Sequence, residues 1–194
     1  NGEYIKWTGG KFSSAGTIDS NYVVTTSSSK TSFNGKVYHA DKVLRYSTKT
    51  LGFAIRDLGV ATTSPYNYFY QFLLASPIYN TTTGDIAGVQ SGNFFTFFIP
   101  TNDAIKQAVI DGLLPGNTTT GAPTFAPTAI TDITKVKNFL LHHFIVKTTT
   151  VPGDGKSGTL ETSLKDALTG DPYFVNVVNT SASTMTVTDR TGRT

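Results

Sequence analysis

Residues 94–105, with the sequence FFTFFIPTNDAI, change character halfway along. The first half is a nearly continuous apolar run, which is long enough for a strand buried on both faces and too short for a helix. Pro100 lacks a backbone N–H and ends strand pairing, and Thr101 or Asn102 can then cap the free amides of a helix. Apolar residues recur at intervals of three and four after the cap, which predicts a helix over residues 102–113. We therefore expect a strand, a cap and a helix joined in one corner.

The composition narrows the class of protein. The chain has 194 residues, of which 38% are hydrophobic, so it can build the core of one large domain, or of one domain with part of another. Only 15% are charged, while Thr, Ser, Asn and Gly are plentiful, which predicts a neutral, hydroxyl-rich surface typical of an exported protein. The net charge is +3, but the lysines and arginines are scattered. Without a run of like charges, a nucleic-acid partner is not expected.

Cysteine usage and hydropathy suggest a cellular compartment. The sequence has no cysteine, which excludes disulfides, thiolate catalysis and cysteine metal sites, and favours a bacterial over an animal exported protein. It shows no signal peptide and no apolar run near about 18 residues, so we expect no direct membrane insertion in this segment. We expect a mature or excised ectodomain that is extracellular or at the cell surface, as in a periplasmic or outer-membrane-anchored lipoprotein. Asn80, Asn117 and Asn179 lie in sequons that would mark exposed loops in a eukaryotic secretory protein but carry no such meaning in most bacteria.

Other segments predict further elements. In residues 1–45 we expect a β-hairpin, with arms at residues 18–25 and 36–44 and a turn at Asn34-Gly35. From residue 46 on, the pattern predicts helices at 47–57 and 65–79 and an exposed insertion at 117–127. A further helix is expected from residue 131, with Thr131 or Asp132 as its cap, followed by an extended segment at 144–146. A short helical or irregular segment is expected at 160–168, and strands at 173–178 and 184–188.

Three segments resemble signatures of the fasciclin adhesion domain. The first signature is matched by Thr96, Phe98, Pro100, Thr101, Asn102 and Ala104, with Ile99 and Ile105 where the family has Ala and Phe. Residues 140–146, LLHHFIV, are similar to the family's Tyr-His signature, with His143 matching the His and His142 replacing the Tyr. Residues 34–44, NGKVYHADKVL, are similar to the closing signature, with Tyr38 in place of a His.

The resemblance implies an α+β fold of the fasciclin type, a small β sandwich or wedge with helices packed around it. It implies that residues 46–194 form a fasciclin-like domain without its own closing strand. Residues 1–45 then belong to a preceding tandem copy or complete this domain, with a tandem-domain or strand-exchange contact. The implied function is non-enzymatic adhesion to an extracellular protein or glycan, without a catalytic, cofactor or metal site. Candidate partner-binding residues are Thr101, Asn102, Asp103 and His143.

Two other functions are considered. Tyr66, Tyr68 and Tyr70 form an aromatic stripe that could stack on sugars, as in a carbohydrate-binding accessory module of a bacterial surface glycan system. Two coplanar, solvent-facing rings would favour that function, and buried rings would exclude it. A deep pocket gathering His143 with a carboxylate and a hydroxyl would favour a hydrolase.

The two adjacent histidines do not predict a metal site. His142 and His143 diverge by about 100° on a helix and face opposite sides of a strand, so neither geometry directs both rings at one ion. We expect the His143 ring to be partly buried and hydrogen-bonded to the backbone where the helix turns into a strand.

Overall fold

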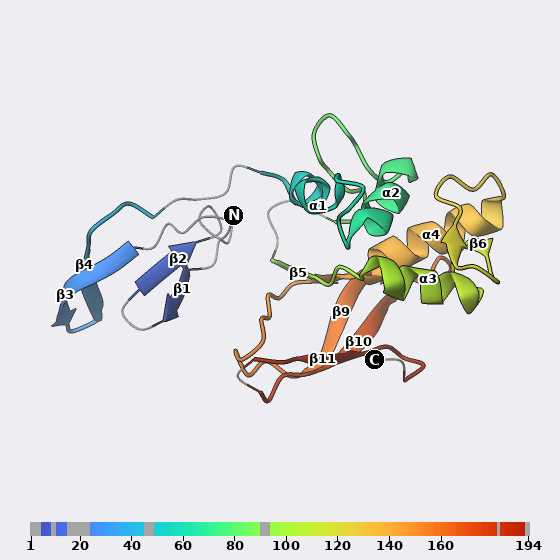
Figure 1. The fold of residues 1–194 in the computed structure, drawn as a ribbon. Helices are drawn as coiled ribbons and strands as arrows, with labels where there is room; N and C mark the ends of the chain where they lie inside the picture. The colour runs from blue at the N-terminus through green and yellow to red at the C-terminus, as the bar shows by residue number, and fades with distance from the viewer. Residues whose placement is uncertain are drawn as a thin grey trace. The chain divides into compact units, whose positions relative to one another are not determined.

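The computed structural model describes residues 5–8, 11–14, 24–44, 49–89, 94–181 and 183–192 (Figure 1). The chain divides into two compact units, Asn1–Lys49 and Thr50–Thr194. The division falls a few residues after the boundary expected at residue 45. Each unit contains its own antiparallel sheet.

The N-terminal unit is a four-stranded sheet in the order β1-β2-β3-β4. Its strands are β1 (Ile5–Thr8), β2 (Lys11–Ser14), β3 (Val24–Ser32) and β4 (Gly35–Ala40). The predicted hairpin is confirmed, but its turn lies at Phe33 and Asn34, one residue earlier than expected, because Ser32 pairs with Gly35.

The first arm of this hairpin was placed wrongly. It covers residues 24–32, which are polar after Val24, whereas the prediction ended it at residue 25. Residues 18–23 lie outside the described residues. Cross-strand pairs stabilise a polar arm, since the Ser28 hydroxyl and His39 Nδ1 are 2.8 Å apart. In the described part of this unit, Val24 is the one buried apolar side chain. β3 and β4 are therefore held by backbone pairing and polar side chains more than by a core.

The C-terminal unit combines four helices with a curled five-stranded antiparallel sheet in its described part, which confirms the α+β class. The helices are α1 (Leu51–Gly59), α2 (Asn67–Ala75), α3 (Asn102–Ile110) and α4 (Ile130–His142). The strands follow the order β11-β10-β9-β8-β5: β5 (Phe95–Phe97), β8 (Phe144–Val146), β9 (Gly158–Lys165), β10 (Pro172–Val178) and β11 (Thr186–Thr188). A two-stranded ribbon, β6 (Gly116–Asn117) and β7 (Ala122–Pro123), follows α3. Figure 1 shows the helices gathered on one side of the strands. None of the described helices has the length and apolar character needed to cross a membrane.

An aromatic core joins the helices to the sheet. Phe97 of β5 stacks on Phe144 of β8, with ring centroids 4.7 Å apart. Phe69 of α2 lies 5.0 Å from Phe97 and 5.7 Å from Phe139 of α4. Phe69 and Phe144 are fully buried, so one continuous cluster fixes α2 and α4 against β5 and β8.

Several sequence predictions for this unit were wrong in detail. β5 is half-buried and ends the strand order, whereas a strand buried on both faces was expected, and Phe94 is 44% exposed. The segment expected to be helical or irregular is β9, because it pairs with both β8 and β10. Helix α4 begins after Ala129, which makes no side-chain cap, so neither Thr131 nor Asp132 is its cap. The supposed exposed insertion places Phe125 against Tyr68 and Phe72, at centroid distances of 5.4 Å and 5.1 Å.

Three loops, residues 80–84, 117–121 and 166–170, share one hydrogen-bonding pattern. Their first residues are Asn80, Asn117 and Asp166, and each side-chain Oδ1 accepts the N–H groups of the second and third residues that follow. Each loop ends in a glycine, with φ of 72°, 71° and 75°, whose N–H donates to the carbonyl of the first residue. Glycine adopts such positive φ values without a steric penalty, so the five residues reverse the chain by themselves.

Candidate functional site

The predicted corner is present at the start of α3. Phe97 ends β5, and Thr101 has extended backbone angles and caps the helix, its Oγ1 accepting the Ala104 N–H at 3.3 Å. Asp103 lies in the first turn, where the positive end of the helix dipole favours a carboxylate. Of the two caps predicted, Thr101 and Asn102, Thr101 is the cap of α3.

Asn102 is engaged inside the fold. Its Oδ1 accepts the Tyr68 N–H at 2.8 Å, its Nδ2 donates to the Ser64 carbonyl at 2.8 Å, and its backbone N–H donates to the Pro65 carbonyl at 2.6 Å. The N-cap residue of α2, Tyr66, makes no side-chain cap of its own. Asn102 thus caps α2 from a neighbouring helix, and both polar atoms of its side chain are used in doing so.

His143 lies at the end of α4, where the chain turns into β8. Its Nδ1 lies 2.7 Å from the Phe139 carbonyl, which can only accept, so the proton is on Nδ1. Burial lowers the pKa of His143 from its ordinary 6.5 to about 4, against the raising effect of the Phe139 hydrogen bond. The ring is therefore neutral at pH 7. The predicted backbone hydrogen bond at the helix-to-strand turn is confirmed.

Two of the four predicted partner-binding residues reach the surface. Thr101 is exposed, and the Asp103 side chain is 90% exposed, with Lys106 Nζ 3.1 Å from its carboxylate. An exposed ion pair of this kind contributes little to folding stability. Asp103 is therefore available to contact a partner, whereas Asn102 and His143 are engaged by the fold.

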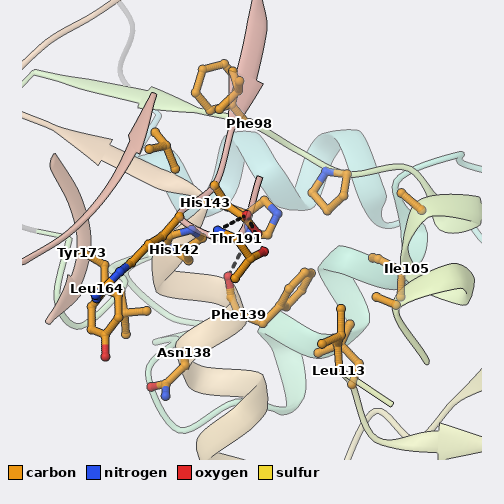
Figure 2. A pocket seen from close by; sticks show the side chains of 18 of the residues that line it. Phe98, Ile105, Leu113, Asn138, Phe139, His142, His143, Leu164, Tyr173 and Thr191 are labelled. Atoms are coloured by element: carbon orange, nitrogen blue, oxygen red, sulfur yellow. Dashed lines mark hydrogen bonds between the residues drawn. The ribbon is translucent and has the colours of Figure 1, made fainter. Parts of the chain in front are cut away.

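A groove with a volume of about 760 Å³ lies beside His143. The segment after β5, helices α3 and α4, and strands β8 to β11 form its walls, so it is open between the sheet and two helices. Its apolar lining includes Phe98, Ala104, Ile105, Leu113, Phe139 and Val187. Figure 2 shows several of the lining side chains, with Phe139, His142 and His143 between Leu113 and Tyr173. In size and apolar character the groove is within the range of small-molecule sites.

Polar side chains line the groove from two elements. Helix α4 contributes Lys135, Asn138 and His142, which share one face because they are three and four residues apart. The turn after β11 contributes Asp189, Arg190 and Thr191. Of these six lining residues, only His142 was noted from the sequence, although the three- and four-residue spacing on α4 is visible there.

The groove gathers His143 with a carboxylate and a hydroxyl, which is the combination that would favour a hydrolase. The Thr191 hydroxyl donates to Asp189 Oδ1 at 2.7 Å, and the His143 Nδ1 proton is used by the Phe139 carbonyl. A nucleophile needs its hydroxyl bonded to the imidazole. The hydrogen bonds of the described residues join the hydroxyl to the carboxylate instead. The same residues contain no group of three His, Cys, Asp or Glu side chains able to hold a metal ion.

The three tyrosines of the aromatic stripe do not form a shared platform. Tyr70 is buried, and Tyr66 and Tyr68 are half-buried. The Tyr68 ring meets Phe125 edge to face, with an interplanar angle of 62°. None of the three side chains is exposed, so the requirement of two solvent-facing rings is not met.

Asn179 is buried, so its sequon does not mark an exposed loop. The residue is 1% exposed. Its Nδ2 donates to Asp154 Oδ1 at 2.6 Å and to the Val151 carbonyl at 2.9 Å, while its Oδ1 accepts the Gly153 N–H at 2.9 Å. The side chain fixes the loop between β8 and β9. Asn80 and Asn117 are exposed, as expected.

Comparison of the chain with protein-family models, with curated proteins and with solved structures found no match.

Proposed function

We propose that this chain is a non-catalytic binding module of the fasciclin type, which adheres to a protein or glycan outside a bacterial cell. Two observations support this function: the segments that resemble fasciclin signatures, and the strand pairing and helix cap that these segments form. The mainly neutral, hydroxyl-rich and cysteine-free composition is in keeping with an exported protein.

One observation carries the proposal: two of the three segments that resemble fasciclin signatures are neighbouring strands. Phe95, Thr96 and Phe97 of β5 pair with Val146, Ile145 and Phe144 of β8. The pairing extends past the strand, because the Phe98 N–H donates to the His143 carbonyl at 3.1 Å. Residues that lie 47 to 51 positions apart, in segments that match one family's pattern, thus form one structural unit, which supports a common origin with that family.

The accessible part of the corner offers a contact surface. Thr101 and Asp103 lie at the exposed start of α3, and the carboxylate of Asp103 can accept hydrogen bonds from a partner. Asn102 and His143 support this surface from within. We therefore assign adhesion to the exposed start of α3 rather than to all four residues.

A binding array with matched variants tests the proposal. The full chain is applied to immobilised extracellular-matrix proteins and glycans, beside Asp103→Asn and the control Asp111→Asn, which removes a charge at the other end of α3. We expect the chain to bind at least one array member, and Asp103→Asn to weaken that binding about fivefold while lowering folding stability by less than about 1 kcal/mol. The proposal would be contradicted if the chain bound no array member, or if Asp103→Asn and Asp111→Asn bound equally well.

A further inference from the structure

We propose that the groove beside His143 binds a free long-chain monocarboxylate, with the alkyl chain along the apolar lining and the carboxylate at Arg190 and Lys135. This site is separate from the exposed start of α3. It does not depend on the adhesive function proposed above.

The apolar lining suits an alkyl chain. Ala104 is exposed, Phe98 is half-buried and Leu113 is 44% exposed, so these side chains border open space in the groove. Helices α3 and α4 and the sheet surround this space on several sides. An alkyl chain lying there would remove apolar surface from water on both partners, which is the main favourable contribution to such binding.

The charged residues of the groove favour an anionic head group. Two cations line it, Lys135 from α4 and Arg190 from the turn after β11, against one acid, Asp189. The Asp189 carboxylate accepts both the N–H and the hydroxyl of Thr191, at 2.8 Å and 2.7 Å. Lys135 has Asp132 at 3.5 Å, in an exposed pair that leaves its ammonium accessible.

Arg190 is the better head-group ligand of the two. It is exposed and makes no ion pair with the residues that the structure describes. Its planar guanidinium matches a carboxylate with two parallel hydrogen bonds, which the ammonium of Lys135 cannot provide. Asn138 adds an amide donor on the same side of the groove as Lys135.

Other ligand classes fit less well. A cationic amphiphile would place its charge beside Arg190 and Lys135. A sugar would lose hydrogen bonds to water over an apolar lining that returns few of them. The geometry therefore points to one negative charge on a flexible apolar body.

The first experiment compares ligands that share one chain and differ in the head group. Dodecanoate, dodecanol and dodecyltrimethylammonium are each titrated into the full chain, the two ionic ligands below their micelle concentrations and dodecanol below its solubility limit, with calorimetry and backbone amide NMR as readouts. We expect dodecanoate to bind one site saturably, about tenfold more tightly than the other two, with shifts on α3, α4 and the turn at residues 189–191. Equal binding of all three ligands, or shifts elsewhere, would overturn the proposal.

The second experiment changes the protein. Ala104→Trp places a large ring over the groove, and Gln107→Trp puts the same ring on α3 outside the lining. Arg190→Gln removes the proposed head-group ligand, and Lys137→Gln removes a charge from α4 outside the lining. We expect Ala104→Trp to abolish dodecanoate binding and Arg190→Gln to weaken it about fivefold, with both controls unchanged. Circular dichroism verifies that each variant is folded.

A lipid membrane is the alternative source of the same anionic amphiphile. Flotation with phosphatidylglycerol vesicles distinguishes the two sources. If the groove binds only a free acid, the protein does not float with intact vesicles. Vesicle binding that persists in Ala104→Trp, or dodecanoate binding unaffected by that variant, would overturn the proposal. Neither result bears on the array experiment with Asp103→Asn, so the two proposals fail separately.

Discussion

Asn102 Oδ1 accepts the backbone N–H of Tyr68 at 2.8 Å, so a residue of α3 supplies the cap that the first turn of α2 lacks. The same amide donates to the Ser64 carbonyl. This link joins segments 34 and 38 residues apart and holds two helices that contribute to the aromatic core. The Asn in the first signature therefore has a structural role that its position in the sequence does not reveal.

We expect Asn102→Ala to lower the free energy of unfolding by about 2 kcal/mol, because it leaves the Tyr68 N–H and the Ser64 carbonyl without their partner. Urea unfolding of the full chain measures the effect. Gln107→Ala, on an exposed position of α3, is the matched control and should change stability by less than about 0.5 kcal/mol. If the two variants unfold at the same urea concentration, Asn102 does not act as a cap for α2.

The buried ring of His143 predicts a pH dependence of stability. Its folded pKa of about 4 lies below the unfolded value of 6.5, so the unfolded chain binds more protons between these values. The contribution of His143 is therefore complete above pH 6.5 and is lost as the pH falls towards 4, by about 2 to 3 kcal/mol. Unfolding free energies measured across this range give the slope.

The variant His143→Gln should lack that part of the slope, and the control His39→Gln, on exposed β4, should keep it. Burial raises the pKa of Asp154, but the backbone N–H groups that donate to its carboxylate lower that pKa below 3.8. Backbone N–H groups also lower the pKa of Asp166 below 3.8, against the raising effect of burial. The stability that both carboxylates contribute is therefore lost at still lower pH. A slope that is the same in His143→Gln and in the unchanged chain would rule out this assignment.

Two backbone segments approach each other so closely at residue 52 that a side chain there would collide with its neighbours. Gly52 N–H donates to the Gly84 carbonyl at 3.2 Å, and a Cβ on Gly52 would lie 2.3 Å from that oxygen and 2.6 Å from the Tyr79 ring. Gly52→Ala should therefore lower the melting temperature, with a loss of about 1 to 3 kcal/mol. A Cβ on Gly35 would meet nothing within 4 Å, so Gly35→Ala is the control and should leave stability nearly unchanged. Equal effects of the two variants would show that residue 52 tolerates a side chain.

The buried amide of Asn179 should be required for the loop between β8 and β9. Asn179→Ala removes the partners of Gly153 and Asp154, so we expect a loss of about 2 to 4 kcal/mol and faster amide exchange at residues 149–157. Asn176→Ala, at an exposed position on β10, the strand that ends just before Asn179, is the control. Hydrogen exchange that is unchanged in this loop would contradict the assigned role.

Local signals in the sequence were sufficient for the corner and for part of the helices. Pro100 and Thr101 act on their immediate neighbours, and the apolar spacing of α4 continues to the His143 turn, so these features were predictable from short windows. β9 was missed because its pairing with β8 and β10 is a tertiary contact that overrides local preference.

The groove could not be predicted for the same reason. Its walls come from α3, α4 and four strands, and Arg190 reaches it from a turn near the end of the described chain. The hydrogen bonds of Asn102 also bridge distant segments. By contrast, the repeated sequence NTTTG at residues 80–84 and 117–121 is visible without a structure and could have predicted the two loops that share it.

The three loops at residues 80–84, 117–121 and 166–170 have a consequence for proteolysis of the chain. Proteases bind their substrates as extended strands in the active-site cleft. A loop that is held by hydrogen bonds to its own Asn or Asp side chain must first open before it fits this cleft. We expect limited digestion to spare residues 80–84, 117–121 and 166–170, and early cutting within them would refute this. In a chain that contains no cysteine, an Asn or Asp side chain and a Gly can thus protect a tight loop against proteolysis, where another protein would use a disulfide.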